Sequence, residues 1–140
     1  MANNILKAAE AHVSAFIETN VKSEHYFHDL NHTRYTVGAA GRLAEDANLD
    51  AESLEILQLA AWFHDTGYSE GASNHELRSC ENARHFLTKN NYPEAKINRI
   101  AGCIMATKLP QRPRNLAEEL LCDADLSHLG NEFYWERTGK

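Results

Sequence analysis

The 140-residue chain has few of the sequence features that divide a protein into domains. It holds only three prolines, and no repeat, low-complexity run or linker divides it. The prolines, at positions 93, 110 and 113, stand where helical patterns stop or start. A chain of this length fits one domain with one hydrophobic core. We therefore expect a single domain over residues 1–140.

Cysteine is scarce too, and its pattern excludes a disulfide framework or a zinc site of the Cys-x-x-Cys kind. Cys80, Cys103 and Cys122 are odd in number and form no such pair. We interpret them as reduced, buried thiols of an intracellular protein. The first 18 residues place Glu10 and His12 inside an apolar pattern and offer no cleavage site, so we expect neither a signal peptide nor a membrane span. The expected location is cytoplasmic.

The chain also lacks positive charge. Its formal net charge is −6, and no basic face is evident, which argues against a nucleic-acid polymer as partner. A small phosphorylated substrate is still allowed, because a bound metal can supply positive charge locally.

No segment alternates apolar and polar residues for long enough to predict a strand. Apolar residues recur instead at helical spacing along most of the chain. The pattern predicts an all-α, compact bundle of six or more short helices, over residues 4–21, 32–47, 51–63 after an Asp50 cap, 75–89 after a Ser73 or Asn74 cap, from Pro93 through Ile104, and from about Asn115 through Leu121.

Histidines and aspartates stand at the ends of the apolar runs. His64 and Asp65 end one run just before Gly67, and their burial would cost several kcal/mol unless they are paired or bind a ligand. His32 begins a predicted helix, and two carboxylates, Asp123 and Asp125, follow another apolar run. Each could cap a helix, but a bundle can aim residues from several helices at one interior point. Such a mixed nitrogen and oxygen set suits Mn, Fe, Co, Ni or Zn as the divalent metal ion, and Mg less well.

Five segments in order strengthen this interpretation: FHDLNHT, WFHDTGY, NHELRSCENARHFL, IAGCIMATKLP and CDADLSHLG. Together they resemble the HD-domain superfamily of metal-dependent phosphohydrolases, whose motif order is His, then His-Asp, then a distant Asp. The resemblance extends from about Tyr26 to Gly130. It implies an HD-domain-like helical fold and hydrolysis of a phosphoester by metal-bound water, in a nucleotide or another small phosphorylated metabolite.

The resemblance also implies roles for particular residues. His32, His64, Asp65 and Asp125 would hold the metal, because Ala-Asp followed by an apolar residue matches the family motif at Asp125. Asp123 is the fallback, and Asp65 would also orient the attacking water.

Further residues are candidates for substrate contact or proton transfer. His75 and Glu76 would contact phosphate or shuttle a proton, unless they only begin a helix. Lys108 and Arg112 would bind phosphate, unless they lie on a solvated basic loop. His28, four residues before His32 across an expected loop, is a weaker substrate-binding candidate.

Three alternatives remain open. The domain could be a regulatory one that binds a metal or nucleotide without catalysis, a di-iron oxygenase with His75 as an extra ligand, or a bundle without a site. Tyr134 and Trp135 near the end have little to pack on, so we expect a domain that lacks its usual C-terminal part or is covered by another chain. A homodimer is therefore allowed.

Overall fold

The computed structural model describes residues 2–20, 23–67, 75–107 and 113–125. Within these ranges all regular structure is helical, which confirms the all-α prediction. The helices are α1 (Ala2–Asn20), α2 (Ser23–Asp46), α3 (Ala51–Phe63), α4 (His75–Lys89), α5 (Glu94–Ala106) and an unlabelled final helix over residues 116–125. Two of them, α1 and α2, have 19 and 24 residues and are not short.

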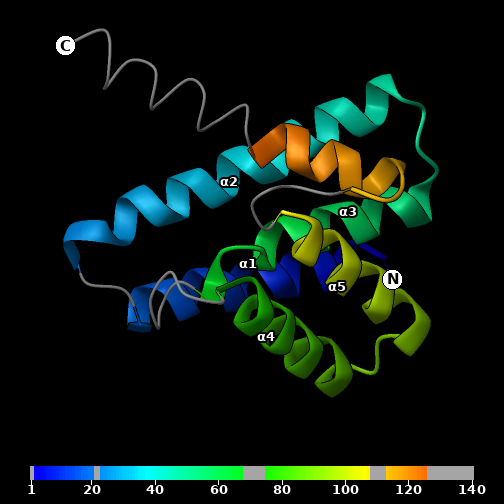
Figure 1. Ribbon diagram of the computed structural model, residues 1–140. Helices are drawn as coiled ribbons and strands as arrows, with labels where there is room; N and C mark the ends of the chain where they lie inside the picture. The colour runs from blue at the N-terminus through cyan, green and yellow to red at the C-terminus, as the bar shows by residue number, and fades with distance from the viewer. Residues whose placement is uncertain (1, 21–22, 68–74, 108–112, 126–140) are drawn as a thin grey trace, which may run out of the picture.

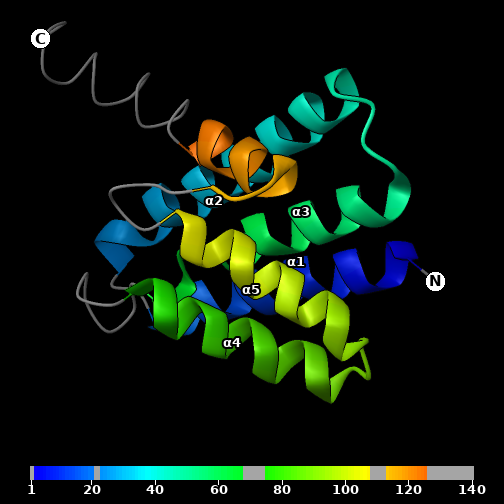
Figure 2. The ribbon, with the colours of Figure 1, turned by 45° about the vertical axis from the view of Figure 1, so that its right-hand side comes forward.

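The α3 helix lies at the centre of the bundle, and α1, α2, α4 and α5 all pack against it (Figures 1 and 2). Its last nine residues are nearly all buried, as expected for a helix that is apolar on every side. The buried α3 residues are Glu55, Ile56, Leu57, Leu59, Ala60, Ala61, Trp62 and Phe63. The end of this central helix therefore delivers the His-Asp pair into the interior.

The start of α3 agrees with the sequence prediction. Asp50 takes an extended backbone conformation, and its side chain accepts a hydrogen bond of 2.8 Å from the Ser53 N–H. In α5 the helix begins one residue later than predicted, because Pro93 occupies the N-cap position and Glu94 the first turn. Ser73 and Asn74, the predicted caps of α4, lie outside the described residues.

The α2 helix corrects the sequence prediction most clearly. It begins at Ser23, so His32 lies well inside a helix and not at its start. His28 lies one turn earlier on the same helix, so no loop separates the two histidines. Residues 23–31 are mostly polar and carry little helical periodicity, so the sequence pattern did not predict a helix there. Leu30 is 5% exposed and belongs to the core.

The structure also bears on the predictions for the cysteines, for membrane-spanning helices and for the C-terminal aromatic residues. All three cysteines are buried and form no disulfide, as predicted. Among the described helices, none is both long enough and apolar enough to cross a membrane. Tyr134 and Trp135 lie outside the described residues.

Candidate metal centre

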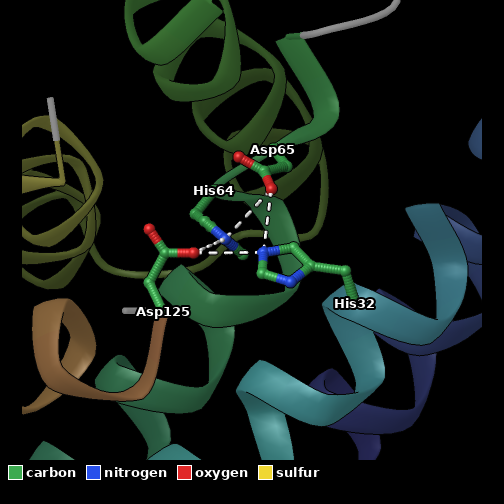
Figure 3. Close-up of side chains that lie close together, drawn as sticks. All are labelled: His32, His64, Asp65 and Asp125. Atoms are coloured by element: carbon green, nitrogen blue, oxygen red, sulfur yellow. Dashed lines mark hydrogen bonds and ion pairs between the residues drawn. The ribbon is translucent and has the colours of Figure 1, made fainter. Parts of the chain in front are cut away.

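Four side chains from distant parts of the chain meet at one point (Figure 3). His32 comes from the middle of α2, His64 and Asp65 directly follow α3, and Asp125 comes from the final helix. One nitrogen or oxygen atom from each lies within 4.8 Å of the other three. The structure thus brings together all four residues that the sequence analysis assigned to a metal.

The closest contacts join each histidine to both carboxylates. His32 Nε2 lies 3.0 Å from Asp125 Oδ1 and 3.2 Å from Asp65 Oδ2. His64 Nε2 lies 3.3 Å from each of the same two oxygens. Two imidazole nitrogens and two carboxylate oxygens therefore face a common centre.

This geometry fits a divalent metal ion. Ligand atoms that contact one ion at about 2.0–2.2 Å lie at most roughly 4.4 Å from one another. The four atoms need only a small contraction to satisfy that limit. Because the set mixes nitrogen and oxygen, it suits a transition metal ion and does not specify which one.

The His64 ring is held in the orientation that a metal ligand needs. Its Nδ1 donates a hydrogen bond of 2.7 Å to the Ala61 carbonyl, one turn back in α3. That bond places the ring proton on Nδ1 and leaves the Nε2 lone pair facing the centre when the imidazole is neutral. The ring is fully buried, so no bulk water competes for it.

Electrostatics favour positive charge at the centre. Burial opposes ionisation of all four groups, but their mutual contacts outweigh it. The charge of His64 and hydrogen bonds from the neighbouring imidazoles hold the pKa of Asp65 well below its usual range. Hydrogen bonds from His32 and His64 lower the pKa of Asp125 to about 2. Asp125 and Asp65 raise the pKa of His32, and the charge of Asp65 raises that of His64 even further. The paired carboxylates thus favour a positive charge at the centre, which a bound cation would supply.

His75 and Glu76 lie beside the four-residue cluster, at the start of α4. His75 Nε2 is 3.5 Å from Asp65 Oδ1 and 3.2 Å from Glu76 Oε2. Asp65 therefore points one oxygen to the cluster and the other to His75. Glu76 is 7% exposed, which distinguishes it from an ordinary solvated residue at a helix start.

The other candidates have different outcomes. Asp123 is exposed, whereas Asp125 faces the cluster, so the geometry favours the first choice over the fallback. Lys108 and Arg112 lie outside the described residues. For His28, the structure gives the helix position only.

The final helix is anchored so that Asp125 reaches the centre. Glu118, only 1% exposed, accepts hydrogen bonds from the backbone N–H and guanidinium of Arg114 and from the Asn115 side chain. Asn115 in turn accepts a bond of 3.0 Å from the Glu118 N–H, so the two residues cap the helix reciprocally. A Cβ at Gly102 in α5 would lie 2.8 Å from Arg114 Nη2 and 3.0 Å from Glu118 Oε2, so α5 packs closely against this cap.

Three polar residues near the site were not singled out from the sequence: Thr66, Ser79 and Asn82. Thr66 follows Asp65, and the other two belong to α4. One signal was available for Ser79, because it falls within the buried stripe of α4 between Glu76 and Ala83. For Asn82 no sequence pattern indicated an inward role.

The sequence matches no protein-family model and no curated protein. The structure, however, resembles the crystal structure of a predicted HD superfamily hydrolase from an uncultured Thermotogales bacterium. The TM-score is 0.69 at 18% sequence identity, over 89% of this chain and 74% of the other. At this identity the likeness establishes the fold alone. The chain therefore has the HD-domain fold, as its motif order predicted.

Proposed function

We propose that the protein is a metal-dependent hydrolase that cleaves a phosphoester in a nucleotide or another small phosphorylated metabolite. The observation that carries this proposal is the convergence of two imidazoles and two carboxylates, from α2, the turn after α3 and the final helix, on one largely buried point. A bundle has no structural need to gather four such groups, two of them buried and two partly buried, because ion pairs in the interior gain little over apolar packing.

In this proposal His32, His64, Asp65 and Asp125 hold a divalent metal ion of the Mn, Fe, Co, Ni, Zn or Mg group. When bound, the ion supplies Lewis acidity toward a phosphoryl oxygen and lowers the pKa of a coordinated water. Asp65 binds the metal ion and also orients the attacking water, since its Oδ2 faces His32 and its Oδ1 faces His75.

Proton transfer falls to the residues next to Asp65. His75 Nε2 lies between a carboxylate of the metal cluster and Glu76, within 3.5 Å of each. A histidine in this position can hold a proton at Nε2 and release it to the leaving oxygen. Lys108, Arg112 and His28 are the proposed contacts to the substrate phosphate.

The direct test is a hydrolysis screen with Mn²⁺, Co²⁺ and Ni²⁺, using p-nitrophenyl phosphate and a panel of nucleotides. His64→Ala and Asp125→Ala should each reduce activity by about 100-fold or more. Loss of a residue that only hydrogen-bonds to a metal ligand already lowers metal affinity or activity by roughly 10–100-fold. The controls are His85→Ala and Glu119→Gln, which replace an exposed histidine and an exposed carboxylate on α4 and the final helix. Activity that survives both ligand substitutions would contradict the proposal.

The alternatives are a regulatory domain and a di-iron oxygenase with His75 as an extra ligand, and the same experiment separates the regulatory domain from a hydrolase. Metal binding that depends on His64 and Asp125, without hydrolysis of any substrate in the panel, would favour the regulatory domain. We prefer catalysis because the ligand set is intact and a histidine suited to proton transfer adjoins it.

A further inference from the structure

The turn that carries the His-Asp pair is held by side chains of α4 that have no role in the proposed chemistry. The Asn82 Nδ2 group donates a hydrogen bond of 3.1 Å to Thr66 Oγ1. One residue further, the Gly67 N–H donates a bond of 2.8 Å to Ser79 Oγ. Both residues that follow Asp65 are thus tied to the same helix.

The backbone of this turn also lies directly against α4. A Cβ atom at Gly67 would come within 2.0 Å of the His75 carbonyl oxygen and 2.9 Å of the Ser79 nitrogen. The Gly67 carbonyl accepts a bond of 3.0 Å from Arg78 Nε on the same helix. The backbone of the turn is thus packed closely against α4, and hydrogen bonds oppose its movement away.

Burial makes these bonds costly to lose. Ser79 is fully buried and Thr66 is 5% exposed, so water cannot readily replace a missing partner. Thr66 Oγ1 also donates to the Phe63 carbonyl at 2.9 Å, at the end of α3. A continuous path of hydrogen bonds therefore connects Asn82 on α4, through Thr66, to the last turn of α3.

Ordinary packing between two helices does not require contacts at this place. These bonds fix the two residues immediately after Asp65. The Asp65 carboxylate contacts His32 with one oxygen and His75 with the other. Its Oδ2 lies 3.2 Å from His32 Nε2, and its Oδ1 lies 3.5 Å from His75 Nε2. Both contacts depend on the orientation of the Asp65 side chain, and therefore on the backbone that carries it.

We propose that Asn82 and Ser79 are positioning residues for the metal centre. They act through Thr66 and Gly67 to fix the carboxylate of Asp65 between the metal ligands and His75. This inference rests on the proposed metal-dependent function.

The first test is Co²⁺ binding to the purified protein, followed by visible absorption, for a matched pair of variants. Thr66→Val keeps the shape of the side chain and removes its hydroxyl, whereas Thr66→Ser keeps the hydroxyl. Thr66→Val should bind Co²⁺ about 10-fold more weakly, with altered absorption bands, as expected for loss of an outer partner of a metal ligand. Thr66→Ser should restore the parent spectrum and most of the affinity.

The second test compares two residues of α4. Asn82→Ala should weaken Co²⁺ binding about as much as Thr66→Val, again roughly 10-fold. Arg84→Ala is the control, because Arg84 donates to Asn98 on α5 at an exposed position away from the turn. It should leave the Co²⁺ affinity and spectrum unchanged.

Thermal unfolding of each metal-free variant separates positioning from stability. Lower unfolding temperatures for Thr66→Val and Asn82→Ala, combined with the parent Co²⁺ affinity and spectrum, would overturn the inference. If Thr66→Val does not fold, Asn82→Ala and Ser79→Ala provide the same readout. Absence of Co²⁺ binding in the parent protein would instead overturn the proposed metal centre, so the two failures are distinguishable.

Discussion

His32 Nε2 lies 3.0 Å from Asp125 Oδ1, although 93 positions separate the two residues in the sequence. This contact joins the middle of α2 to the final helix across the end of α3 (Figure 3). The cluster is therefore a product of the tertiary fold, since no single helix or turn contains it. Substitutions that disturb how these helices meet should affect the cluster even when they replace none of its members.

Gly67 should tolerate no side chain. Gly67→Ala would place a Cβ 2.0 Å from the His75 carbonyl oxygen, so we expect a loss of about 3 kcal/mol or more in the free energy of unfolding. Gly38→Ala is the matched control, because this exposed α2 position offers ordinary contact only, with Arg42 Nη1 at 3.5 Å. It should stabilise the protein by about 0.5–1 kcal/mol through helix propensity. Urea unfolding of both variants measures this, and equal effects would refute the close approach.

Much of the fold could be predicted from the sequence because its apolar spacing is strong. The limits of α3 follow from the Asp50 cap and the apolar run that ends at Phe63. The early start of α2 could not be predicted, because residues 23–31 carry mostly polar side chains without a clear helical period. Sequence patterns predict a helix best where the helix carries a stripe of apolar residues that becomes buried.

The candidate cluster was predictable for a different reason. The order of His32, His64, Asp65 and the last aspartate follows a motif, and the structure brings those residues together. The motif could not show how the turn after Asp65 is supported, because the bond to Thr66 comes from Asn82, a polar residue of α4 that resembles a surface residue in sequence. Contacts between distant polar groups depend on packing that a one-dimensional pattern does not contain.

The pair formed by Tyr92 and Glu55 should matter for stability. Glu55 is 8% exposed, and its Oε1 accepts a bond of 2.6 Å from the Tyr92 hydroxyl. Within the described part of the chain, its Oε2 has no hydrogen-bond partner. Tyr92→Phe removes the remaining bond and should cost about 1–3 kcal/mol in the free energy of unfolding.

A double substitution tests the cause of that loss. Replacing both partners, with Glu55→Leu and Tyr92→Phe together, removes the buried carboxylate and should recover most of the stability. If the double variant is as unstable as the sum of the two single variants, the two side chains do not interact.

The buried thiols should react slowly. Burial raises the pKa of Cys80 and Cys122 to about 11 and that of Cys103 to about 12. At pH 8 the thiolate fraction is then roughly a thousandth or less, and access is restricted as well. Ellman's reagent should therefore modify the folded protein at least about 100-fold more slowly than the protein in guanidinium, where all three thiols react.

The pH dependence of this reaction gives a second readout. Each folded-state pKa lies above the ordinary thiol value, so the native rate should keep rising beyond pH 9 as more thiolate forms. One thiol that reacts at the unfolded rate in the native protein would contradict its burial.

The most direct measurement is the metal content of the purified chain, determined by elemental analysis beside His64→Ala, Asp125→Ala and Asp123→Asn. The account predicts about one transition metal ion per chain in the parent protein and in Asp123→Asn, and loss of the metal in the other two variants. Asp123 is exposed two residues from Asp125, so this variant tests which carboxylate binds. No metal in the parent chain after incubation with Mn²⁺, Co²⁺, Ni²⁺ or Zn²⁺, or equal metal in all four proteins, would contradict the account.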